Sequence, residues 1–339
     1  MPDLRLEDIA KKAGVSRSTV SRVVNNQLNV SDKVRQRVLK VIQETGFSPN
    51  AAARTLVSQR SNTIGLVLPH SVSTFFTDPY YPHLIKGISL ACNHYDFTLA
   101  LFVAGSREYQ EKILPRLSSP GFLDGIIIQS GHQAEQSIIQ ELVKTRIPVL
   151  VAGRPLYEDQ ICFIDIDNVA ASEKAVRHLI QTGYKHIATI TGLLSSTVGY
   201  DRLTGYKKAL ESSSLKYNPA LIMESDFTES GGYTAMQKLL PFKPDAIFAA
   251  SDMMAIGAIR AIRDAGLKVP NNVAVVGFDD LPIPAVNEYQ LTTINQPVVQ
   301  FGFKAVETLM ELIESNTAVV KQVLLETELI VRKTCGAIK

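Results

Sequence analysis

The sequence predicts a small all-α head with a helix-turn-helix, followed by an α/β body of two doubly wound parallel-sheet lobes. Three observations support this prediction. Apolar residues recur at helical spacing through the first 47 residues. From Thr63 onward, short runs rich in β-branched residues alternate with helical stretches, as in βαβ units. The alternation occurs once before and once after Asp165, which indicates two similar lobes.

Length and composition favour several globular units. The chain has 339 residues, of which 45% are hydrophobic and 20% charged, so it is too long for one typical domain. No apolar run approaches the roughly 20 residues of a membrane span, and the amphipathic start "MPDLRLEDIAKKAG" is unlike a signal peptide. We therefore expect a cytoplasmic protein without a membrane partner. Cys92, Cys162 and Cys335 lie far apart, which favours buried small hydrophobes over a metal pair or a disulfide framework.

The charge of +2 is unevenly distributed. Up to Arg60 there are 11 Lys and Arg against 5 Asp and Glu, or +6, which leaves 24 against 28, or −4, for the rest. A basic head on a mildly acidic body suggests that the head alone binds a polyanion. A solvated lysine-rich face would explain the same count.

Two helices begin the head. The first has one apolar face and ends at Gly14, a C-terminal cap. Ser16 is the natural N-cap of the second helix, with Val15 and Val20 placed for a hydrophobic staple. The inward positions of these two helices are Leu6, Ile9, Ala10 and Ala13, and Val20, Val23 and Val24.

A third helix completes the head. Ser31 caps its start and Gly46 closes its end. Its inward residues are Val34, Val38, Val41 and Ile42. Three short helices thus enclose one small core, in a DNA-binding domain that we place at residues 1–47.

The exposed side of the second helix is polar and basic. Such a helix, joined to its neighbour by a short glycine-containing turn, is typical of the recognition helix that enters the DNA major groove. Arg17 and Arg22 can bond guanine edges, and Ser18 can reach a base. Short donors suited to phosphates are Ser16, Thr19, Ser21 and Asn25. The alternative is an ordinary solvated helix face. We also count Ser31 among the DNA-binding residues.

Residues 48–61 are predicted to form a hinge helix and linker. Ser48 and Pro49 resemble an N-cap and first helical residue, but so short a helix is unstable alone. Ala53 permits close approach of two helices, and Leu56 lacks an obvious core. The segment is either a plain linker or a hinge that folds when two copies meet on DNA, with Leu56 as a minor-groove wedge.

Residues 62–339 form the two-lobed body. Eight of its apolar runs predict strands, namely "TIGLVL", "FTLALFV", "DGIIIQ" and "IPVLVA" before Asp165, and "HIATIT", "ALIME", "DAIFAA" and "VAVVGF" after it. A long helix, "QPVVQFGFKAVETLMELIES", and a final β-rich run, "VLLETELIVRK", follow. We expect lobe one to span about 62–164 and 293–320, and lobe two about 165–292 and 321–335.

Ligands of such folds collect beyond the carboxyl ends of the strands. Asp and Arg can bind adjacent hydroxyls there while an aromatic ring covers the apolar face of a sugar. The candidates at these ends are Tyr80, Tyr81, Arg154, Arg202, Ser251, Asp252, Asp279 and Asp280. Structural alternatives remain, because Asp252 could cap a helix and Asp280 or Arg154 could form an ion pair.

Catalytic chemistry lacks support. The sequence contains no G-x-x-x-x-G-K-[ST] loop, G-x-S-x-G elbow or H-E-x-x-H zinc motif, and no nucleotide fingerprint follows the first strand. The six histidines are scattered. We therefore expect neither an enzyme nor a bound cofactor or metal.

Several long motifs resemble the lactose-repressor family of bacterial transcription regulators, in that family's order. They include "LEDIAKKAGVSRSTVSRVVNN", "VSDKVRQRVLKVIQETGFSPNAAARTL", "DIDNVAASEKAVRHLIQTGYKHIATITG" and "SDMMAIGAIRAIRDAGLKVPNNVAVVGFDD". The resemblance implies a helix-turn-helix head, a hinge helix and a dimerising effector domain similar to periplasmic sugar-binding proteins. Operator DNA, a small-molecule effector and a second copy of the chain are then the expected partners.

The resemblance also implies roles for single residues. Arg17, Ser18 and Arg22 would read bases, and Leu56 would be the wedge. The backbone contacts would be Ser16, Thr19, Asn25 and Asn50. We also count Ala53 of the hinge among the DNA-binding residues. The effector positions would be Tyr80, Tyr81, Arg202, Phe227, Ser251 and Asp279.

Three departures from the family pattern bear on these roles. Arg5 stands where a Thr usually caps the first helix, Ser251 replaces a frequent Asn, and Gly153 stands where some sugar sensors have an acid. We expect a repressor controlled by a sugar, with a purine-type corepressor as the alternative and a transport-type sugar receptor as a second. No tetramerising heptad repeat follows the last strand, so we expect a dimer.

Overall fold

The computed structural model describes residues 4–24, 29–47, 60–69, 71–130, 136–156, 160–315 and 320–337. The chain divides into two compact units, Met1–Ser61 and Asn62–Lys339. No helix in these ranges is long and apolar enough to span a membrane. Most of the predicted hinge, including Asn50, Ala53 and Leu56, lies outside the described residues, as does Asn25.

The first unit is the predicted three-helix head. Its helices are α1 (Leu6–Ala13), α2 (Arg17–Val24) and α3 (Asp32–Thr45). The buried core residues are Ile9, Ala10, Ala13, Val20, Val23, Val38 and Phe47. Val24, Val34, Val41 and Ile42, also predicted to face inward, pack around this core and are partly buried. The helix-turn-helix prediction is confirmed.

Most of the predicted caps form. Gly14 adopts a left-handed conformation (φ 62°), and so does Gly46 (φ 61°). The Ser16 hydroxyl accepts the Thr19 backbone N–H at 3.2 Å. The cap of α1 comes from Asp8, whose carboxylate accepts the Arg5 backbone N–H at 2.8 Å.

The predicted Ser31 cap is wrong in one respect. Ser31 stands at the N-cap position of α3 with extended backbone angles, but its side chain makes no capping hydrogen bond within the described part of the head. The sequence predicts that Ser31 stands at the N-cap position, but it does not determine the side-chain rotamer that a capping hydrogen bond requires.

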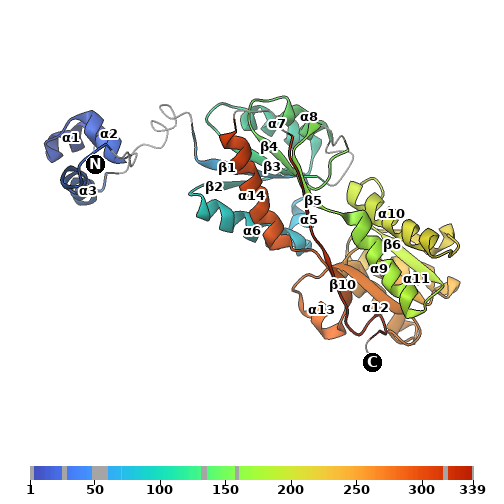
Figure 1. Ribbon diagram of the computed structural model, residues 1–339. Helices are drawn as coiled ribbons and strands as arrows, with labels where there is room; N and C mark the ends of the chain where they lie inside the picture. The colour runs from blue at the N-terminus through green and yellow to red at the C-terminus, as the bar shows by residue number, and fades with distance from the viewer. Residues whose placement is uncertain are drawn as a thin grey trace. The chain divides into compact units, whose positions relative to one another are not determined.

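The second unit contains two six-stranded sheets, one in each lobe (Figure 1). The order in lobe one is β11-β5-β4-β3-β1-β2 and that in lobe two is β12-β10-β9-β8-β6-β7. Lobe-one strands are β1 (Thr63–Leu68), β2 (Thr98–Val103), β3 (Gly125–Gln129), β4 (Val149–Ala152), β5 (Phe163–Ile166) and β11 (Gln322–Leu325). Lobe-two strands are β6 (Ile187–Thr191), β7 (Ile222–Glu224), β8 (Ala246–Ala249), β9 (Ala274–Asp279), β10 (Thr292–Asn295) and β12 (Glu328–Ile330).

Helices cover both faces of each sheet, so each sheet has one apolar core on either side. Lobe one carries α5 (Val72–Thr77), α6 (Tyr80–His94), α7 (Arg107–Leu117), α8 (Gln136–Val143) and α14 (Val298–Glu314). Lobe two carries α9 (Asn168–Thr182), α10 (Thr197–Ser212), α11 (Glu229–Leu239), α12 (Asp252–Asp264) and α13 (Pro284–Tyr289), with short 3-10 turns at Pro219–Leu221 and Leu240–Phe242. The doubly wound prediction is confirmed.

One strand departs from the parallel pattern. The final β-rich run breaks into two strands, of which β11 pairs parallel with β5 in lobe one and β12 pairs antiparallel with β10 in lobe two. Both pieces are short and alternate in the same way, so their sequence could not assign them to different sheets.

The chain passes between the lobes three times. Sheet membership places these crossings after β5 at Ile166, after β10 at Asn295 and after β11 at Leu325. The predicted boundaries at 164, 292 and 320 are therefore short by two to five residues. The reason is that β5, β10 and β11 each complete the sheet of the lobe that the chain is leaving.

Candidate functional site

The exposed side of α2 carries the predicted base-reading residues. Arg17, Ser18 and Arg22 are exposed, whereas Thr19 and Ser21 are half-buried. The Arg17 Nε lies 3.0 Å from Glu7 Oε1, but both side chains are more than half exposed. An ion pair so exposed is weak and breaks at little cost, so Arg17 remains available to a partner.

The hydroxyls beside these arginines are positioned by the turn. Ser16 Oγ lies 2.8 Å from both Ser18 Oγ and Thr19 Oγ1, while it also caps α2. Ser31 is exposed at the start of α3. The head thus presents two guanidinium groups and short donors on one helix, as major-groove binding requires.

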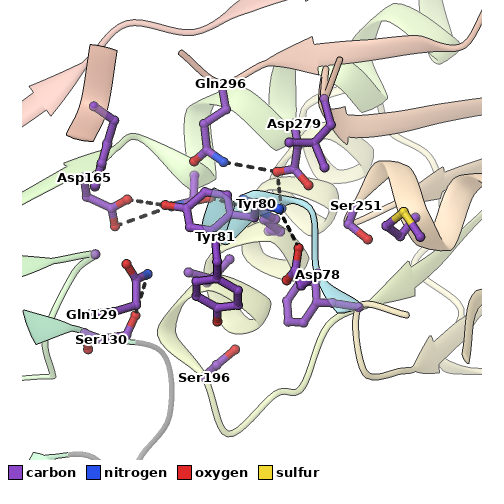
Figure 2. A pocket seen from close by; sticks show the side chains of 18 residues that line it. Asp78, Tyr80, Tyr81, Gln129, Ser130, Asp165, Ser196, Ser251, Asp279 and Gln296 are labelled. Carbon is purple, nitrogen blue, oxygen red and sulfur yellow. Dashed lines mark hydrogen bonds and ion pairs between the residues drawn. The ribbon is translucent and has the colours of Figure 1, made fainter. Parts of the chain in front are cut away.

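A second site lies in a cleft between the two lobes of the body (Figure 2). Its open space, including the mouth, is about 820 Å³, which suits a small molecule. We call this cleft the inner cavity. Six of the predicted effector residues line it, namely Tyr80, Tyr81, Arg202, Phe227, Ser251 and Asp279. Lining residues that the sequence analysis missed include Asp78, Gln129, Ser130, Asp165, Asn168, Ser196 and Gln296.

Arg202 is the central cation of the inner cavity and is only 4% exposed. Its Nη1 donates to the Ala250 carbonyl at 2.6 Å and to Asp279 at 3.3 Å, and its Nε donates to Asn168 at 2.9 Å. The guanidinium carbon lies 3.6 Å from the centroid of the Phe278 ring. These contacts fix Arg202 rigidly, so a ligand meets a preorganised donor.

Among the described residues that line the inner cavity, three carboxyl groups accompany one cation, Arg202. Burial raises the pKa of Asp165 to about 6 and that of Asp279 to about 7, although Arg202 opposes the second shift. Burial also raises the pKa of Asp78. Because negative charge already exceeds positive charge here, an anionic ligand would be repelled.

Two buried polar atoms in the wall have no partner among the described residues. They are Gln129 Oε1 and Ser130 Oγ, which follow one another at the carboxyl end of β3. Figure 2 places both side chains at the same wall of the inner cavity. A buried acceptor without a partner costs free energy, and a ligand with hydroxyl groups would satisfy it.

Unusual backbone angles also cluster here. Phe227 (φ 65°) and Asp279 (φ 115°) both have positive φ and both line the inner cavity. The Phe227 ring packs so closely on Gly192 that a Cβ at that glycine would collide with it. Strain of this kind persists only where the surrounding structure enforces it, and it often occurs at ligand-binding sites.

Gly153, one of the family departures, also faces the inner cavity. Its φ is +99°, and a Cβ there would lie 2.9 Å from the Ser130 carbonyl oxygen. The backbone of this loop therefore leaves no room for an acidic side chain, and Ser130 occupies the adjacent wall.

The placement of Arg154 in the inner cavity is wrong. Its guanidinium binds Asp201 of α10 in a bidentate manner, with Nε to Oδ2 at 2.8 Å and Nη2 to Oδ1 at 2.6 Å. The Arg154 backbone N–H donates to Asp165, and its carbonyl accepts from Thr197. Arg154 thus ties lobe one to lobe two beside the inner cavity.

The remaining strand-end residues have structural partners. Asp280 pairs with Arg332 at 2.8 Å. Asp252 accepts from Leu281 and Thr293, whereas the capping of α12 is done by Ser251, whose hydroxyl accepts the Met254 N–H at 3.2 Å. Within the described ranges, no group of three His, Cys, Asp or Glu residues could hold a metal ion.

The chain matches known proteins over most of its length. Residues 5–50 match the sequence model of bacterial regulatory proteins of the lacI family, and residues 176–335 match that of a periplasmic binding protein-like domain. It is 37% identical over 333 residues to the HTH-type transcriptional regulator CelR of Thermobifida fusca, covering 97% of each chain. This chain belongs to the lacI family of bacterial regulatory proteins.

Solved structures agree with that membership. A lac repressor dimer bound to operator and an anti-inducer matches with a TM-score of 0.84 and 28% identity, over 98% of this chain and 99% of that one. A complex of the regulator CelR with cellobiose matches with a TM-score of 0.77 and 34% identity, over the same shares. This lacI-family chain is accordingly a DNA-binding transcriptional regulator, with the head as its DNA-binding part and the body as its effector-binding part.

Proposed function

We propose that this regulator is a homodimeric repressor whose affinity for operator DNA is controlled by an uncharged sugar bound in the inner cavity. The chemistry of that cavity is the main support. It offers carboxylate acceptors, one fixed guanidinium donor, two unpartnered polar atoms and aromatic rings. Adjacent hydroxyls on a ring with apolar faces complement such a set.

Charge supports an uncharged ligand. In the described lining of the cavity, Asp78, Asp165 and Asp279 face one cation, Arg202, which is already bonded to Asp279, Asn168 and Ala250. A sugar phosphate or a carboxylate would bring further negative charge to this cavity without a free cation to meet it. The complex of CelR with cellobiose is an example of an uncharged sugar bound by a relative.

Binding would act by shifting the lobes. The cavity walls come from both lobes, so a ligand that contacts both favours one relative position of the lobes over others. In a dimer, two copies of α2 would occupy successive major grooves of a near-palindromic operator, and the sugar would change how well they fit. The role involves no bond-making step, and it places the protein in the cytoplasm with the DNA.

The purine-type corepressor is the competing effector, since a purine repressor of Histophilus somni is 30% identical to this chain. Calorimetry with a panel of neutral sugars, sugar phosphates, nucleobases and nucleosides separates the possibilities. We expect binding by a neutral sugar and none by the phosphates. Binding by a nucleobase alone would overturn the sugar assignment, and retention of operator affinity at saturating sugar in a gel-shift assay would overturn its regulatory role.

A further inference from the structure

A second cavity lies next to the inner cavity and opens outward. We call it the outer cavity, and its open space including the mouth is about 1750 Å³. Four residues line both cavities, namely Asp78, Tyr81, Phe227 and Met253. The two cavities therefore adjoin at these four side chains.

Both lobes contribute to the outer cavity. Lobe one supplies Ser73 and Thr77 of α5 together with Asp78 and Tyr81, and α5 lies beside the junction of the lobes in Figure 1. Lobe two supplies the first turns of α11 and the side chain of Arg260 from α12. A ligand extending into this space would touch both lobes, as one in the inner cavity does.

The walls combine aromatic rings with short polar groups. Tyr81, Phe227 and Tyr233 provide the rings. The polar groups are Asp226, Thr228, Glu229, Ser230 and Thr234. Rings that cover apolar faces, together with acceptors and hydroxyls at their edges, are the same chemistry that the inner cavity offers.

The charged groups of the outer cavity favour a neutral over an anionic occupant. Arg260 forms an ion pair with Glu229. Asp226 Oδ1 accepts from the Thr228 hydroxyl at 2.7 Å and from its backbone N–H at 3.1 Å. Asp78, Asp226 and Glu229 against Arg260 leave an excess of negative charge on the described walls, so an anionic occupant is disfavoured and a neutral one can bond the remaining acceptor positions.

The rings are held in place before any ligand arrives. Tyr233 Oη donates to Asp264 Oδ2 at 2.9 Å, which anchors the outer end of its ring. Phe227 is fixed by its positive φ and by its packing on Gly192. A fixed ring that borders both cavities can contact two successive units of one ligand without further ordering.

We propose that the effector is an oligosaccharide, with one glycosyl unit in the inner cavity and the next in the outer cavity against Tyr233. This inference rests on the proposed function, that is, on a neutral sugar as the effector. It adds that a disaccharide binds more tightly than either of its units, because Tyr233 and Arg260 contact only the second unit.

The first measurement compares ligands on the whole protein. Calorimetry is done with glucose, galactose, ribose and mannose, and with cellobiose, maltose, lactose and trehalose. We expect at least one disaccharide to bind about ten-fold or more tightly than its component monosaccharides. Binding of a monosaccharide as tight as that of every disaccharide would refute the outer site but leave the sugar-controlled repressor standing. Failure of all eight sugars would refute the proposed function itself.

The second measurement uses variants of the outer wall. Tyr233→Ala should weaken the disaccharide about three- to ten-fold and leave the monosaccharide unchanged, because an aromatic contact is lost from the second unit only. Tyr233→Phe is the matched control, which keeps the ring and should retain nearly full affinity for both ligands.

Tyr233 also packs on the lobe-two core, so Tyr233→Ala could fail to fold. A second variant at a more exposed position of the outer cavity therefore tests the same proposal independently. The Arg260 side chain is 54% exposed, so Arg260→Ala should fold normally. It should likewise weaken the disaccharide alone. Equal losses for mono- and disaccharide in Arg260→Ala, or no loss for either, would contradict the assignment of the second unit to the outer cavity.

Discussion

Asp279→Asn tests whether a carboxylate in the inner cavity recognises the effector. Asp279 Oδ1 accepts from Arg202 at 3.3 Å and from Gln296 at 3.2 Å, and the residue is 7% exposed. Asn has the same shape and tolerates the positive φ of this position, so the backbone should not move. The substitution therefore removes charge and little else.

The pKa of Asp279 gives the expected size and sign of the stability effect. Burial raises this pKa from 3.8 to about 7, so the folded protein holds the proton more tightly than the unfolded chain does. The resulting stabilisation is fully present below pH 3.8 and is lost as the pH rises through about 7. It amounts to about 4 kcal/mol. In Asp279→Asn this pH dependence should disappear, and the variant should unfold later than wild type at pH 8.

Effector binding should respond in the opposite direction. The ionised carboxylate is the stronger acceptor, so the affinity of wild type for its sugar should rise between pH 6.5 and 8.5, above the pKa of Asp165 near 6. A hydrogen bond to a charged group contributes about 1.5 to 3 kcal/mol, so the Asn variant should bind about 10- to 100-fold more weakly at pH 8.5. Its affinity should be nearly independent of pH.

Calorimetry and thermal unfolding across this pH range measure both effects on the same samples. Asp165→Asn is the matched control, because it neutralises a second buried carboxyl of the inner cavity whose titration is centred lower. An Asn variant whose stability still falls as the pH rises through about 7, as in wild type, or whose sugar affinity at pH 8.5 is unchanged, would refute the placement of an ionised Asp279 against the ligand.

Three further predictions concern other parts of the chain. In a double-mutant cycle of Arg154→Met and Asp201→Asn, effector affinity should show a coupling of about 1 to 2 kcal/mol. The reason is that this ion pair joins the two lobes and its side chains are only 28% and 11% exposed. Additive effects of the two substitutions would show that the pair plays no part in closure of the lobes. Arg22→Ala should cost about 1 to 3 kcal/mol on operator but little on unrelated DNA in gel-shift titrations, and equal losses on both would make Arg22 a backbone contact. Leu56→Ala should raise the operator Kd about ten-fold or more without changing the circular dichroism of the free protein, if Leu56 is a minor-groove wedge; wild-type affinity would support a plain linker.

Local physics explains what the sequence could predict. The helices of the head follow from apolar spacing and from Gly14 and Gly46, whose left-handed conformations suit glycine alone. The strands of the body follow from apolar runs that only a sheet covered on both faces can bury. Six of seven effector candidates line the inner cavity because the carboxyl ends of parallel strands meet at one edge.

The misplacement of Arg154 arose from a contact between distant segments. Its partner Asp201 lies 47 residues later on a helix, and no local pattern links the two. An ion pair is the structural alternative for Arg154, and the choice between the two roles depends on how the lobes meet. Assignment of β11 and β12 to different sheets depends on the same tertiary information.

Gln129 and Ser130 could have been predicted as cavity residues from their position in the sequence. They follow "GIII", a fully buried strand, and a polar pair at the end of such a strand stands at the edge where ligands bind. The candidates predicted at these ends do not include this amide or this hydroxyl. Their lack of partners became evident only once the surrounding wall was in place.

The inner cavity is costly to maintain in the absence of a ligand. Phe227 and Asp279 hold strained backbone angles, Gln129 Oε1 and Ser130 Oγ are buried without partners among the described residues, and burial raises the pKa of Asp165 to about 6. The four apolar cores on the sheet faces stabilise the fold and offset these costs. Of the residues just named, only Phe227 packs against one of these cores. A ligand that satisfies the polar atoms lowers the free energy only of the lobe arrangement in which both walls reach it. That selectivity, more than tight binding itself, is what allows a small molecule to change the shape of a regulator.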